Sequence, residues 1–408
     1  MRRHLVLCGG GHAHLFTLSR LAAFFEAGID VTCVAPSPHL SYSGMGPGML
    51  SGRYAPAELR FDVERMVREA SGGQEGRRPS WTTPPGGIIP PGPPGGGGKG
   101  VGAFVRGSVA GIDPEARRLR LADGREIRYD AVSFGIGSVV APPFPVDASP
   151  GVGVYPVKPI ENLLLARRAI ESRVEAGEAV QVLVVGGGTS AFEVAGNTLG
   201  LLTGLGVKKP LVTVVTGRGL LCGWPGRARR LAHAALARRG ARRITGRVTR
   251  LRGDRAELAD GGGVRCDVCL VATGTRPPEL FAQAGLALGP DGGLSVNAFL
   301  QSPLFPEIFG GGDCIHFAPA PLPRAGVYAV RQGPVLFANL LAFLTGRQLT
   351  PFGKTGQNFL SLLNCGDGRA ILRKGPLVLE GRWCMALKDA IDRRFIRRFA
   401  ARAISVAP

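Results

Sequence analysis

The sequence is poor in acidic side chains, with 30 Asp and Glu against 50 Lys and Arg, and its formal net charge is +20. Lysine is also scarce, so 43 of the basic residues are arginine. This balance suits anionic partners such as dinucleotide phosphates or anionic lipid, although a compositional bias that places solvated arginine on the surface would give the same excess. The basic residues are scattered, and no nucleic-acid-binding motif accompanies them, so we expect no nucleic-acid partner.

Long apolar runs are missing, since no stretch reaches the roughly 18 uninterrupted apolar residues that a membrane-spanning helix needs. Apolar residues still make up 45% of the 408 residues, which excludes a wholly disordered chain and predicts two or three domains. The eight cysteines are dispersed, and the N-terminal segment is not a credible secretory signal. We therefore expect reduced, mostly buried thiols and a cytoplasmic protein.

Two stretches that lie 177 residues apart, counted from Gly9 to Gly186, repeat one pattern of strand, glycine turn, helix and strand. The repeated elements are expected at 4–8, 9–11, 13–27 and 31–35, and again at 182–185, 186–188, 190–202 and 211–215. Strands that alternate with helices form parallel sheets. The repeat predicts an α/β protein with two Rossmann-like, three-layer ββα dinucleotide-binding domains.

One segment differs sharply in composition from the rest of the chain. Residues 71–100 contain 11 Gly and 7 Pro in 30 positions. Such a stretch has few side chains to bury and few backbone donors to pair, so it is expected to be a disordered surface insertion or linker.

The first turn, Gly9-Gly10-Gly11, has two glycines of the dinucleotide-binding fingerprint. Glycine permits the tight turn and lets the backbone approach a pyrophosphate. His14 takes the third glycine position, where it either loosens the packing of helix on strand or brings an imidazole near the phosphates. No acidic residue follows at the end of the next strand, and Ser37 is the candidate for the ribose contact.

The second turn matches the Gly/Ala form of the fingerprint, with Gly186, Gly188 and Ala191 at the required spacing and Thr189 between them. The strand after it also ends without an acid. Arg218 stands there instead, either as a partner for the 2′-phosphate of NADPH or as a solvated loop residue.

Further small-residue motifs follow strands of the buried type. They are Gly137, the Ala-Thr-Gly ending at Gly274, and Gly312-Asp313. Small residues let the chain pass close to a cofactor, and a carboxylate at a strand end accepts hydrogen bonds from sugar-like hydroxyls. Each motif is weak alone, but together with the two glycine turns they form an ordered set.

That ordered set resembles the two-dinucleotide-binding flavoproteins, the pyridine nucleotide-disulfide oxidoreductase family. Within it, the sequence is most similar to type II NADH dehydrogenases, to sulfide:quinone oxidoreductases and to the NADH-dehydrogenase-like module fused to selenide, water dikinase. The stretches that carry the resemblance are 4–14, 42–48, 325–333, 362–368 and 381–395.

The resemblance implies that the first turn and Asp313 hold FAD and that the second turn holds NAD(P)H in an inserted domain. It also assigns Gly137, Gly274 and Gln332 to cofactor binding. The domains are then expected at 1–150 and 293–348 for FAD, at 151–292 for NAD(P)H, and at 349–408 for a C-terminal region.

Glu193 is the one residue to which the resemblance gives a catalytic role. The family commonly has Glu at this position, where a carboxylate hydrogen-bonds the carboxamide and orients the nicotinamide. The alternative is a glutamate stabilised by the helix dipole. Lys158 either approaches the flavin or, in the interpretation that we favour, is a linker residue.

The cysteines bear on the subclass, because disulfide reductases of this family need a close pair beside the flavin. Cys8 and Cys33 fall in predicted strands, and Cys266 and Cys269 lie three apart in another, where their side chains should face opposite sides. We interpret all four as core thiols. Cys314 and Cys365 are the thiols that a sulfide-oxidising enzyme would place near the flavin, and no metal-ligand pattern is seen.

The tail is expected to form a basic helix at about 384–404, with Leu387, Ile391, Phe395 and Phe399 at four-residue steps. Such a helix either lies on an anionic membrane or packs its apolar stripe on the protein.

The sequence thus predicts an FAD-dependent NAD(P)H dehydrogenase that reduces a quinone or another small electron acceptor. It is expected in the cytoplasm, either free or on the inner face of the membrane. A homodimer is one option for its oligomeric state. The alternatives are a sulfide or selenium-compound oxidoreductase that uses a cysteine, and a non-catalytic nucleotide-sensing or partner-binding module.

Overall fold

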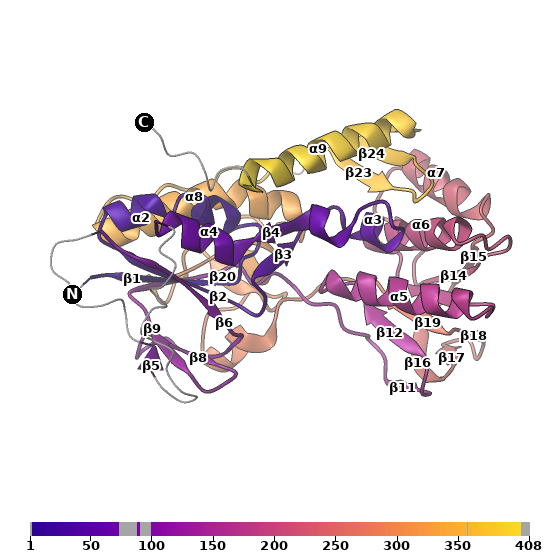
Figure 1. Ribbon diagram of the computed structural model, residues 1–408, viewed down its shortest axis with the longest axis horizontal. Helices are drawn as coiled ribbons and strands as arrows, with labels where there is room; N and C mark the ends of the chain where they lie inside the picture. The colour runs from indigo at the N-terminus through magenta and orange to yellow at the C-terminus, as the bar shows by residue number, and fades with distance from the viewer. Residues whose placement is uncertain (1, 73–87, 90–98, 357, 401–408) are drawn as a thin grey trace.

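The computed structural model describes residues 2–72, 88–89, 99–356 and 358–400, and it holds two parallel five-stranded sheets at opposite ends of an elongated molecule (Figure 1). The first sheet has the order β21-β10-β1-β2-β6. Its strands are β1 (His4–Cys8), β2 (Asp30–Ala35), β6 (Gly102–Arg106), β10 (Ala131–Phe134) and β21 (Ile308–Gly310). Every residue of β1 and β2 is buried, which is typical of a parallel sheet covered on both faces.

The second sheet has the order β12-β19-β13-β14-β15 and is likewise parallel throughout. Its strands are β12 (Gly153–Pro156), β13 (Gln181–Val185), β14 (Leu211–Thr216), β15 (Arg242–Thr245) and β19 (Val268–Val271). In both sheets the strand before the glycine turn is flanked by the strand that follows the turn, as the sequence pattern predicts.

The helices follow the predicted pattern with one difference. The stretch 13–27, predicted as one helix, forms the two short helices α1 (Leu15–Leu18) and α2 (Ala22–Glu26). The helix after the second turn is continuous. The remaining helices are α3 (Gly46–Leu50), α4 (Val63–Ala70), α5 (Glu161–Glu175), α6 (Thr189–Gly204), α7 (Gly226–Ala237), α8 (Gly326–Thr345) and α9 (Arg382–Ala400), with short 3-10 turns at Pro56–Leu59, Glu279–Ala284 and Gly312–Cys314.

Smaller sheets are attached to the two large ones. They contain β3 (His39–Ser41) with β4 (Arg60–Asp62); β5 (Ile88–Ile89), β7 (Val109–Asp113), β8 (Arg118–Leu121) and β9 (Glu126–Arg128); β11 (Val146–Ala148), β16 (Val248–Gly253), β17 (Arg255–Leu258) and β18 (Gly263–Arg265); β20 (Leu294–Val296) with β22 (Ile315–Phe317); and β23 (Ser361–Asn364), β24 (Ala370–Lys374) and β25 (Leu377–Gly381).

Two of these strands refine the predicted boundaries. The segment predicted to be disordered contains β5, which pairs with β9, so it is not without structure throughout; residues 73–87 and 90–98 lie outside the described residues. Strand β11 precedes the expected boundary at residue 150 but pairs with β16 of the second unit.

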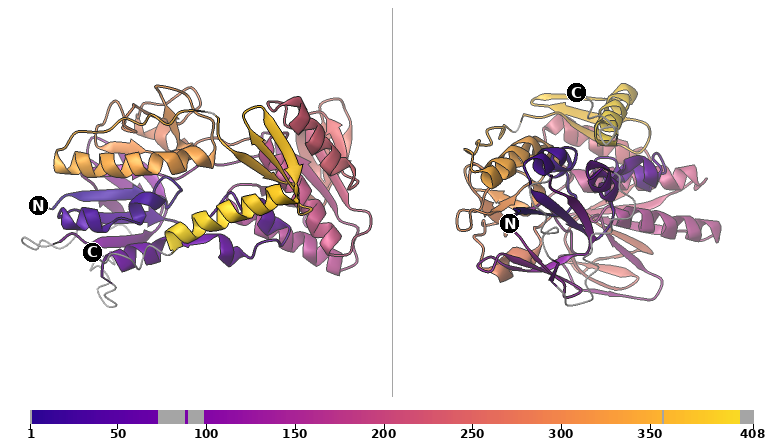
Figure 2. Two further views of the ribbon diagram at one scale, coloured as in Figure 1. Left: turned by 90° about the horizontal axis from the view of Figure 1, so that it is seen from above. Right: turned by 60° about the vertical axis from the view of Figure 1, so that its left-hand side comes forward.

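Helix α9 crosses from one unit to the other, as both views in Figures 1 and 2 show. Near its start, Cys384 and Met385 belong to the core of the second unit. At its other end, Phe399 belongs to the core of the first unit, and Ile396 packs against both. Helix α3 also reaches across, because Met49 is part of the second unit's core.

Among the described residues, one helix, α8, is long and apolar enough to cross a membrane by length and composition. Half of its most apolar window is buried inside the protein, where it packs against the first sheet, so this is weak evidence for a span.

Candidate functional site between the two glycine turns

A cavity of about 1600 Å³, called the central cavity below, opens between the two large sheets. It runs from the first glycine turn past the start of α6 to the inner side of α9. Its walls include residues from both units and from the C-terminal region: Gly9, Ser37, Tyr42, Gly137, Lys158, Thr189, Glu193, Asp313, Leu360, Lys388, Ile391 and Phe395. A ligand inside it would therefore touch segments that lie far apart in the sequence.

The first glycine turn forms one end of the central cavity and leaves no space for side chains. A Cβ on Gly11 would lie 2.1 Å from the carbonyl oxygen of Gly135, and one on Gly10 would lie 2.7 Å from the side chain of Val63. Gly9 has a φ of +86°, a conformation that costs other residues strain. The turn thus presents bare backbone to the cavity, which is what close approach of a pyrophosphate requires.

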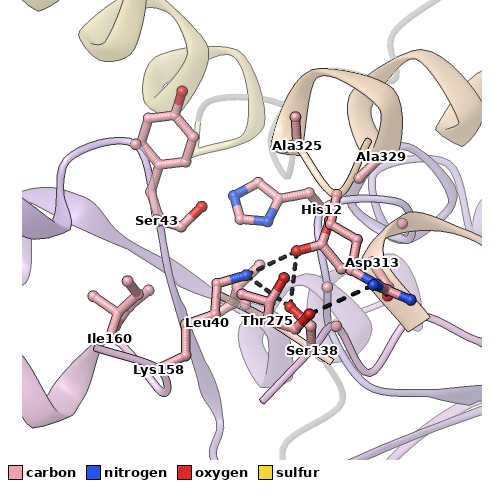
Figure 3. A pocket seen from close by; sticks show the side chains of 18 of the residues that line it. His12, Leu40, Ser43, Ser138, Lys158, Ile160, Thr275, Asp313, Ala325 and Ala329 are labelled. Atoms are coloured by element: carbon pink, nitrogen blue, oxygen red, sulfur yellow. Dashed lines mark hydrogen bonds and ion pairs between the residues drawn. The ribbon is translucent and has the colours of Figure 1, made fainter. Parts of the chain in front are cut away.

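An ion pair stands at the floor of the central cavity, where Figure 3 shows it beneath His12. Lys158 Nζ lies 2.8 Å from Asp313 Oδ2 and donates to Ser138 Oγ at 2.9 Å. The Ser138 hydroxyl in turn donates to Asp313 at 2.9 Å. Lys158 is therefore not a linker residue, because its ammonium neutralises the carboxylate that the sequence assigns to FAD.

The turn that carries Asp313 is held from behind by two side chains. Gln332 on α8 accepts a hydrogen bond of 2.7 Å from the backbone N–H of Gly312. Arg324 donates to the carbonyl of Asp313 at 3.1 Å and to the carboxylate of Asp291 at 2.7 Å. Gln332 thus positions the predicted cofactor turn and does not line the central cavity itself.

Two histidines of the first turn have different surroundings. His12 lines the central cavity, and burial lowers its pKa to about 4. Its Nε2 is buried and has no hydrogen-bond partner among the described residues. His14 is fully buried under the turn. Its Nδ1 lies within hydrogen-bonding distance of the Gly9 carbonyl oxygen, at 2.6 Å, and its Nε2 within that of the Ser133 hydroxyl, at 2.8 Å. His14 therefore packs the turn onto β10, and His12, which the sequence did not single out, faces the cavity.

The second glycine turn is also close-packed on its inner side. Gly186 has a φ of +140°, and a Cβ there would lie 2.2 Å from the carbonyl oxygen of Ala272. Gly188 precedes the first turn of α6, and a Cβ there would meet nothing within 4 Å. Thr189 and Glu193 line the central cavity, so the N-terminal end of α6, where the first backbone N–H groups have no partner within the helix, opens onto it.

Glu193 is held in the cavity wall without a cation in hydrogen-bonding contact among the described residues. Its Oε1 accepts a hydrogen bond of 2.8 Å from the backbone N–H of Asn364, which precedes the loop between β23 and β24. Burial raises the pKa of Glu193 to about 7, and the more distant charge of Lys388 opposes this rise. The carboxyl group is thus balanced between its two protonation states near neutral pH.

The inner side of α9 closes the cavity with a buried ion pair. Lys388 Nζ lies 2.7 Å from Asp392 Oδ2, and it also donates to the carbonyl of Gly44 at 2.7 Å. Tyr42 donates its hydroxyl proton to the other oxygen of Asp392 at 3.0 Å. Burial, with help from the Asp392 charge, raises the pKa of Tyr42 far above its usual range.

None of the cysteines among the described residues lines the central cavity. Cys314 and Cys365 are completely buried, and burial raises the pKa of Cys314 to about 12. The expectation that Cys266 and Cys269 face opposite sides is wrong. Cys266 precedes β19, and its side chain interacts with that of Cys269 within the core of the second unit.

The structure thus divides the predicted site residues into two groups. Those that line the central cavity are Gly9, Gly10, Gly11, Ser37, Gly137, Gly312, Asp313, Thr189 and Glu193. Those that do not are His14, Gly186, Gly188, Ala191, Arg218, Gly274 and Gln332. Arg218 is exposed after the end of β14. The cavity also has walls that were not predicted, namely His12, Tyr42, Lys388 and Asp392, whose contacts join distant segments.

Comparison with known proteins agrees with this geometry. The family model described as pyridine nucleotide-disulphide oxidoreductase matches residues 3–333. The chain belongs to this family. Its members bind FAD and NAD(P)H, and their fold has the two Rossmann-like domains seen here.

Three proteins that are similar to this chain have different names. Ferroptosis suppressor protein 1 of Xenopus tropicalis is 25% identical over 284 residues, which cover 65% of this chain and 70% of that protein. The mitochondrial internal alternative NAD(P)H-ubiquinone oxidoreductase A1 of Solanum tuberosum is 26% identical over 257 residues, which cover 60% and 49%. The solved sulfide:quinone oxidoreductase of Aquifex aeolicus is 16% identical with a TM-score of 0.73, covering 99% and 93%, and this likeness shows the fold.

The residues present fit the flavin that the family implies. A Cβ on any glycine of the first turn would collide with backbone or a side chain. Only glycine therefore fits in this turn, and its bare backbone faces the cavity, where it can bind a phosphate. A carboxylate, an ammonium and a hydroxyl stand together on the cavity floor (Figure 3). The space of about 1600 Å³ exceeds the roughly 300–1,000 Å³ of ordinary ligand pockets and suits a dinucleotide with a second ligand.

Proposed function

We propose that this chain is an FAD-dependent NAD(P)H dehydrogenase that passes electrons to a quinone-type acceptor. The observation that carries the proposal is the continuity of the central cavity. One space connects the first glycine turn, the N-terminal end of α6 and the apolar residues Ile391 and Phe395 of α9. A flavin, a nicotinamide and an apolar acceptor would each find suitable walls there.

The chain's own residues would divide the work of binding. The first turn would hold the pyrophosphate of FAD, Ser37 its ribose, and Asp313 its ribityl hydroxyls. Bound FAD supplies the chemistry, because it accepts hydride from NAD(P)H and hands the electrons on. Glu193 would hydrogen-bond the carboxamide and orient the nicotinamide, and misorientation of a reactant is costly in rate. Arg218 would favour NADPH by pairing with its 2′-phosphate.

The absence of cysteine from the cavity walls, among the described residues, favours electron transfer without a thiol relay. A sulfide or selenium-compound oxidoreductase would need a thiolate beside the flavin, and the buried Cys314, whose pKa is raised to about 12, is poorly suited to that role. A non-catalytic nucleotide-sensing module would need no second ligand space next to Glu193.

An exposed apolar row on α9 supports contact with a membrane surface. Trp383, Leu387 and Ile391 lie four residues apart and are exposed, at 53%, 36% and 42%. Exposed arginines follow them at 394, 397 and 398. An apolar row beside cationic side chains is typical of helices that lie on anionic membranes. Because Ile391 also lines the central cavity, a quinone dissolved in the membrane would enter beside it, and the protein would bind peripherally on the cytoplasmic face.

The proposal is tested by half-reactions followed at the flavin absorbance. The purified protein should be yellow with about one FAD, and anaerobic NADH or NADPH should bleach it. Addition of a short-chain quinone should restore the colour without any added thiol. Asp313→Ala should lower the flavin content, because it removes the acceptor for the ribityl hydroxyls. A protein that stays colourless after incubation with FAD, or a reduced flavin that quinone does not reoxidise, would contradict the proposal.

A further inference from the structure

Helix α9 is attached to the N-terminal part of the chain by two sets of the same composition. Each set contains one tyrosine, one aspartate and one cation. The outer set is Arg53, Tyr54 and Asp389, in which both Arg53 and the Tyr54 hydroxyl donate to the Asp389 carboxylate. The inner set is Tyr42, Lys388 and Asp392. The two aspartates stand three residues apart on the same helix.

The two sets differ in what they face. No residue of the outer set lines the central cavity, and the side chains of Arg53 and Asp389 are 35% and 22% exposed to solvent. All three residues of the inner set line the cavity, and Lys388 and Asp392 are each only 7% exposed. Because the outer set already fastens α9, attachment alone does not explain a second, buried ion pair. Removing two charged groups from water to this degree costs free energy of folding. We therefore infer that the inner set has a function in the cavity.

The geometry leaves Lys388 with a proton to give. An ammonium group has three N–H donors. Among the described residues, those of Lys388 have two acceptors, the carbonyl of Gly44 and the carboxylate of Asp392. The remaining donor lies on a side chain that lines the cavity, beside the apolar Ile391 and Phe395 of the same helix.

We propose that Lys388 is the general acid that protonates the oxygen of the electron acceptor, and that Tyr42 and Asp392 position it. This inference rests on the proposed reduction of a quinone. A quinone becomes a quinol by taking up two electrons and two protons. The two electrons and one proton derive from the hydride of NAD(P)H. Lys388 gives the second proton: its N–H bond breaks as the O–H bond of the quinol forms, and the neutral amine then takes a proton from water at the cavity mouth.

Charged and titratable groups from several elements surround this set. Glu193 of α6 interacts electrostatically with Lys388 and Asp392. His12 lies with its ring 5.4 Å from that of Tyr42, and Asp313 and Lys158 act on His12 from the cavity floor. Among the described residues, the Asp392 carboxylate is the acidic group in direct contact with Lys388.

The decisive experiment compares two acceptors on the flavin-loaded enzyme. A short-chain quinone needs protons on reduction, whereas ferricyanide takes electrons alone. In Lys388→Met, we expect kcat with the quinone to fall about 100-fold, as is usual for loss of a general acid, while ferricyanide reduction stays within about twofold. Lys388→Arg should restore the KM for quinone but not kcat, because a guanidinium holds its proton.

The same two acceptors test the positioning residues separately. Asp392→Asn should lower kcat with the quinone about tenfold and leave ferricyanide reduction within about twofold, because it removes the carboxylate that holds the ammonium in place. Tyr42→Phe should lower kcat more mildly and with normal flavin content, so it tests the set even where the Lys388 variants fold poorly.

The outer set supplies the matched controls. Asp389→Asn and Tyr54→Phe remove the same groups from the same helix, and both acceptors should be reduced at the wild-type rate. Equal slowing of quinone and ferricyanide in Lys388→Met, or quinone reduction at the wild-type rate in Asp392→Asn, would overturn the role of Lys388. A wild-type protein that reduces ferricyanide with NAD(P)H but no quinone would instead refute the proposed function.

Discussion

At the first glycine turn a Cβ on Gly11 would lie 2.1 Å from the carbonyl oxygen of Gly135, and at the second a Cβ on Gly186 would lie 2.2 Å from that of Ala272. Both turns therefore press bare backbone against the end of a neighbouring strand. They differ in what they face, because the glycines of the first turn line the central cavity and Gly186 and Gly188 do not. The glycine spacing thus determines how a turn packs against the neighbouring strand. The segments around the turn determine whether it lines the cavity.

The residue at the sixth position of each motif separates the two units further. Ala191 sits in a continuous helix of 16 residues, close to where a Cβ on Gly186 would be. His14 precedes a helix of only four residues and replaces apolar contact by hydrogen bonds to Gly9 and Ser133. The small Ala191 lets its helix pack directly on the turn. The larger, polar His14 needs hydrogen bonds to be buried at the same position.

One methyl group placed on each turn tests most directly whether the two turns have different roles. Gly11→Ala should lose most of the flavin and about 3 kcal/mol of stability, because the carbonyl of Gly135 cannot move away. Gly186→Ala should keep the flavin but slow its reduction by NAD(P)H. Flavin absorbance and stopped-flow reduction measure the two effects. Gly204→Ala, at the end of α6, is the control, since among the described residues its Cβ would meet no atom within 4 Å. Loss of flavin in Gly186→Ala would show that the turns do not act independently.

The role of His14 can be tested against that of an exposed histidine. His14→Ala should cost about 2–4 kcal/mol, because it leaves a cavity and two buried groups without partners. The melting temperature should fall by several degrees while flavin still binds. Burial lowers the pKa of His14 to about 4, so its contribution is lost as the pH falls from 6.5 towards 4. His39→Ala, at an exposed position, should leave the melting temperature unchanged.

Two of the carboxylates that line the cavity, Asp313 and Glu193, offer a comparison by pH. Asp313 has Lys158 beside it, whereas Glu193 has no such partner among the described residues, and burial raises its pKa to about 7. Folded protein therefore binds this proton more tightly than unfolded protein does, and stability should fall as the pH rises from about 4.5 to 7. Glu193→Gln removes this dependence. The difference in melting temperature between the variant and the wild type should therefore shift in favour of the variant as the pH rises from 5 to 8. The exposed Glu175→Gln should show no such gain.

The smallest expected effect concerns the nucleotide at the second turn. Arg218→Ala should raise the KM for NADPH about tenfold, which corresponds to about 1.4 kcal/mol, and leave the KM for NADH unchanged. Steady-state kinetics with both nucleotides measure this difference. An equal change for both would assign Arg218 to the fold or to general attraction of anions.

The sequence was most informative where neighbouring residues determine structure. Gly9-Gly10-Gly11 and Gly186-Gly187-Gly188 predicted two turns between strand and helix, and both are present. The family and its fold followed from the order of such motifs. The predicted helix at 190–202 corresponds to α6 (Thr189–Gly204). The basic tail helix predicted at about 384–404 corresponds to α9 (Arg382–Ala400) as far as residue 400, and residues 401–404 lie outside the described residues.

Long-range contacts were beyond the sequence. Lys158 was taken for a linker residue because nothing near it suggests that Asp313, 155 positions away, is its partner. The four-residue stripe on α9 predicted one apolar face, yet Phe399 is buried while Leu387 and Ile391 are exposed. Periodicity identifies a helix face, but it does not show which part of that face another segment covers.

The course of α9 across the molecule also bears on how the protein unfolds. Its start is part of one hydrophobic core and its end is part of the other, so neither core can be exposed without disturbing the same helix. Two units with separate cores often melt one after the other. Here the shared helix couples them, so flavin release and loss of helical signal should occur in a single cooperative transition. Destabilising substitutions in either core should shift that whole transition.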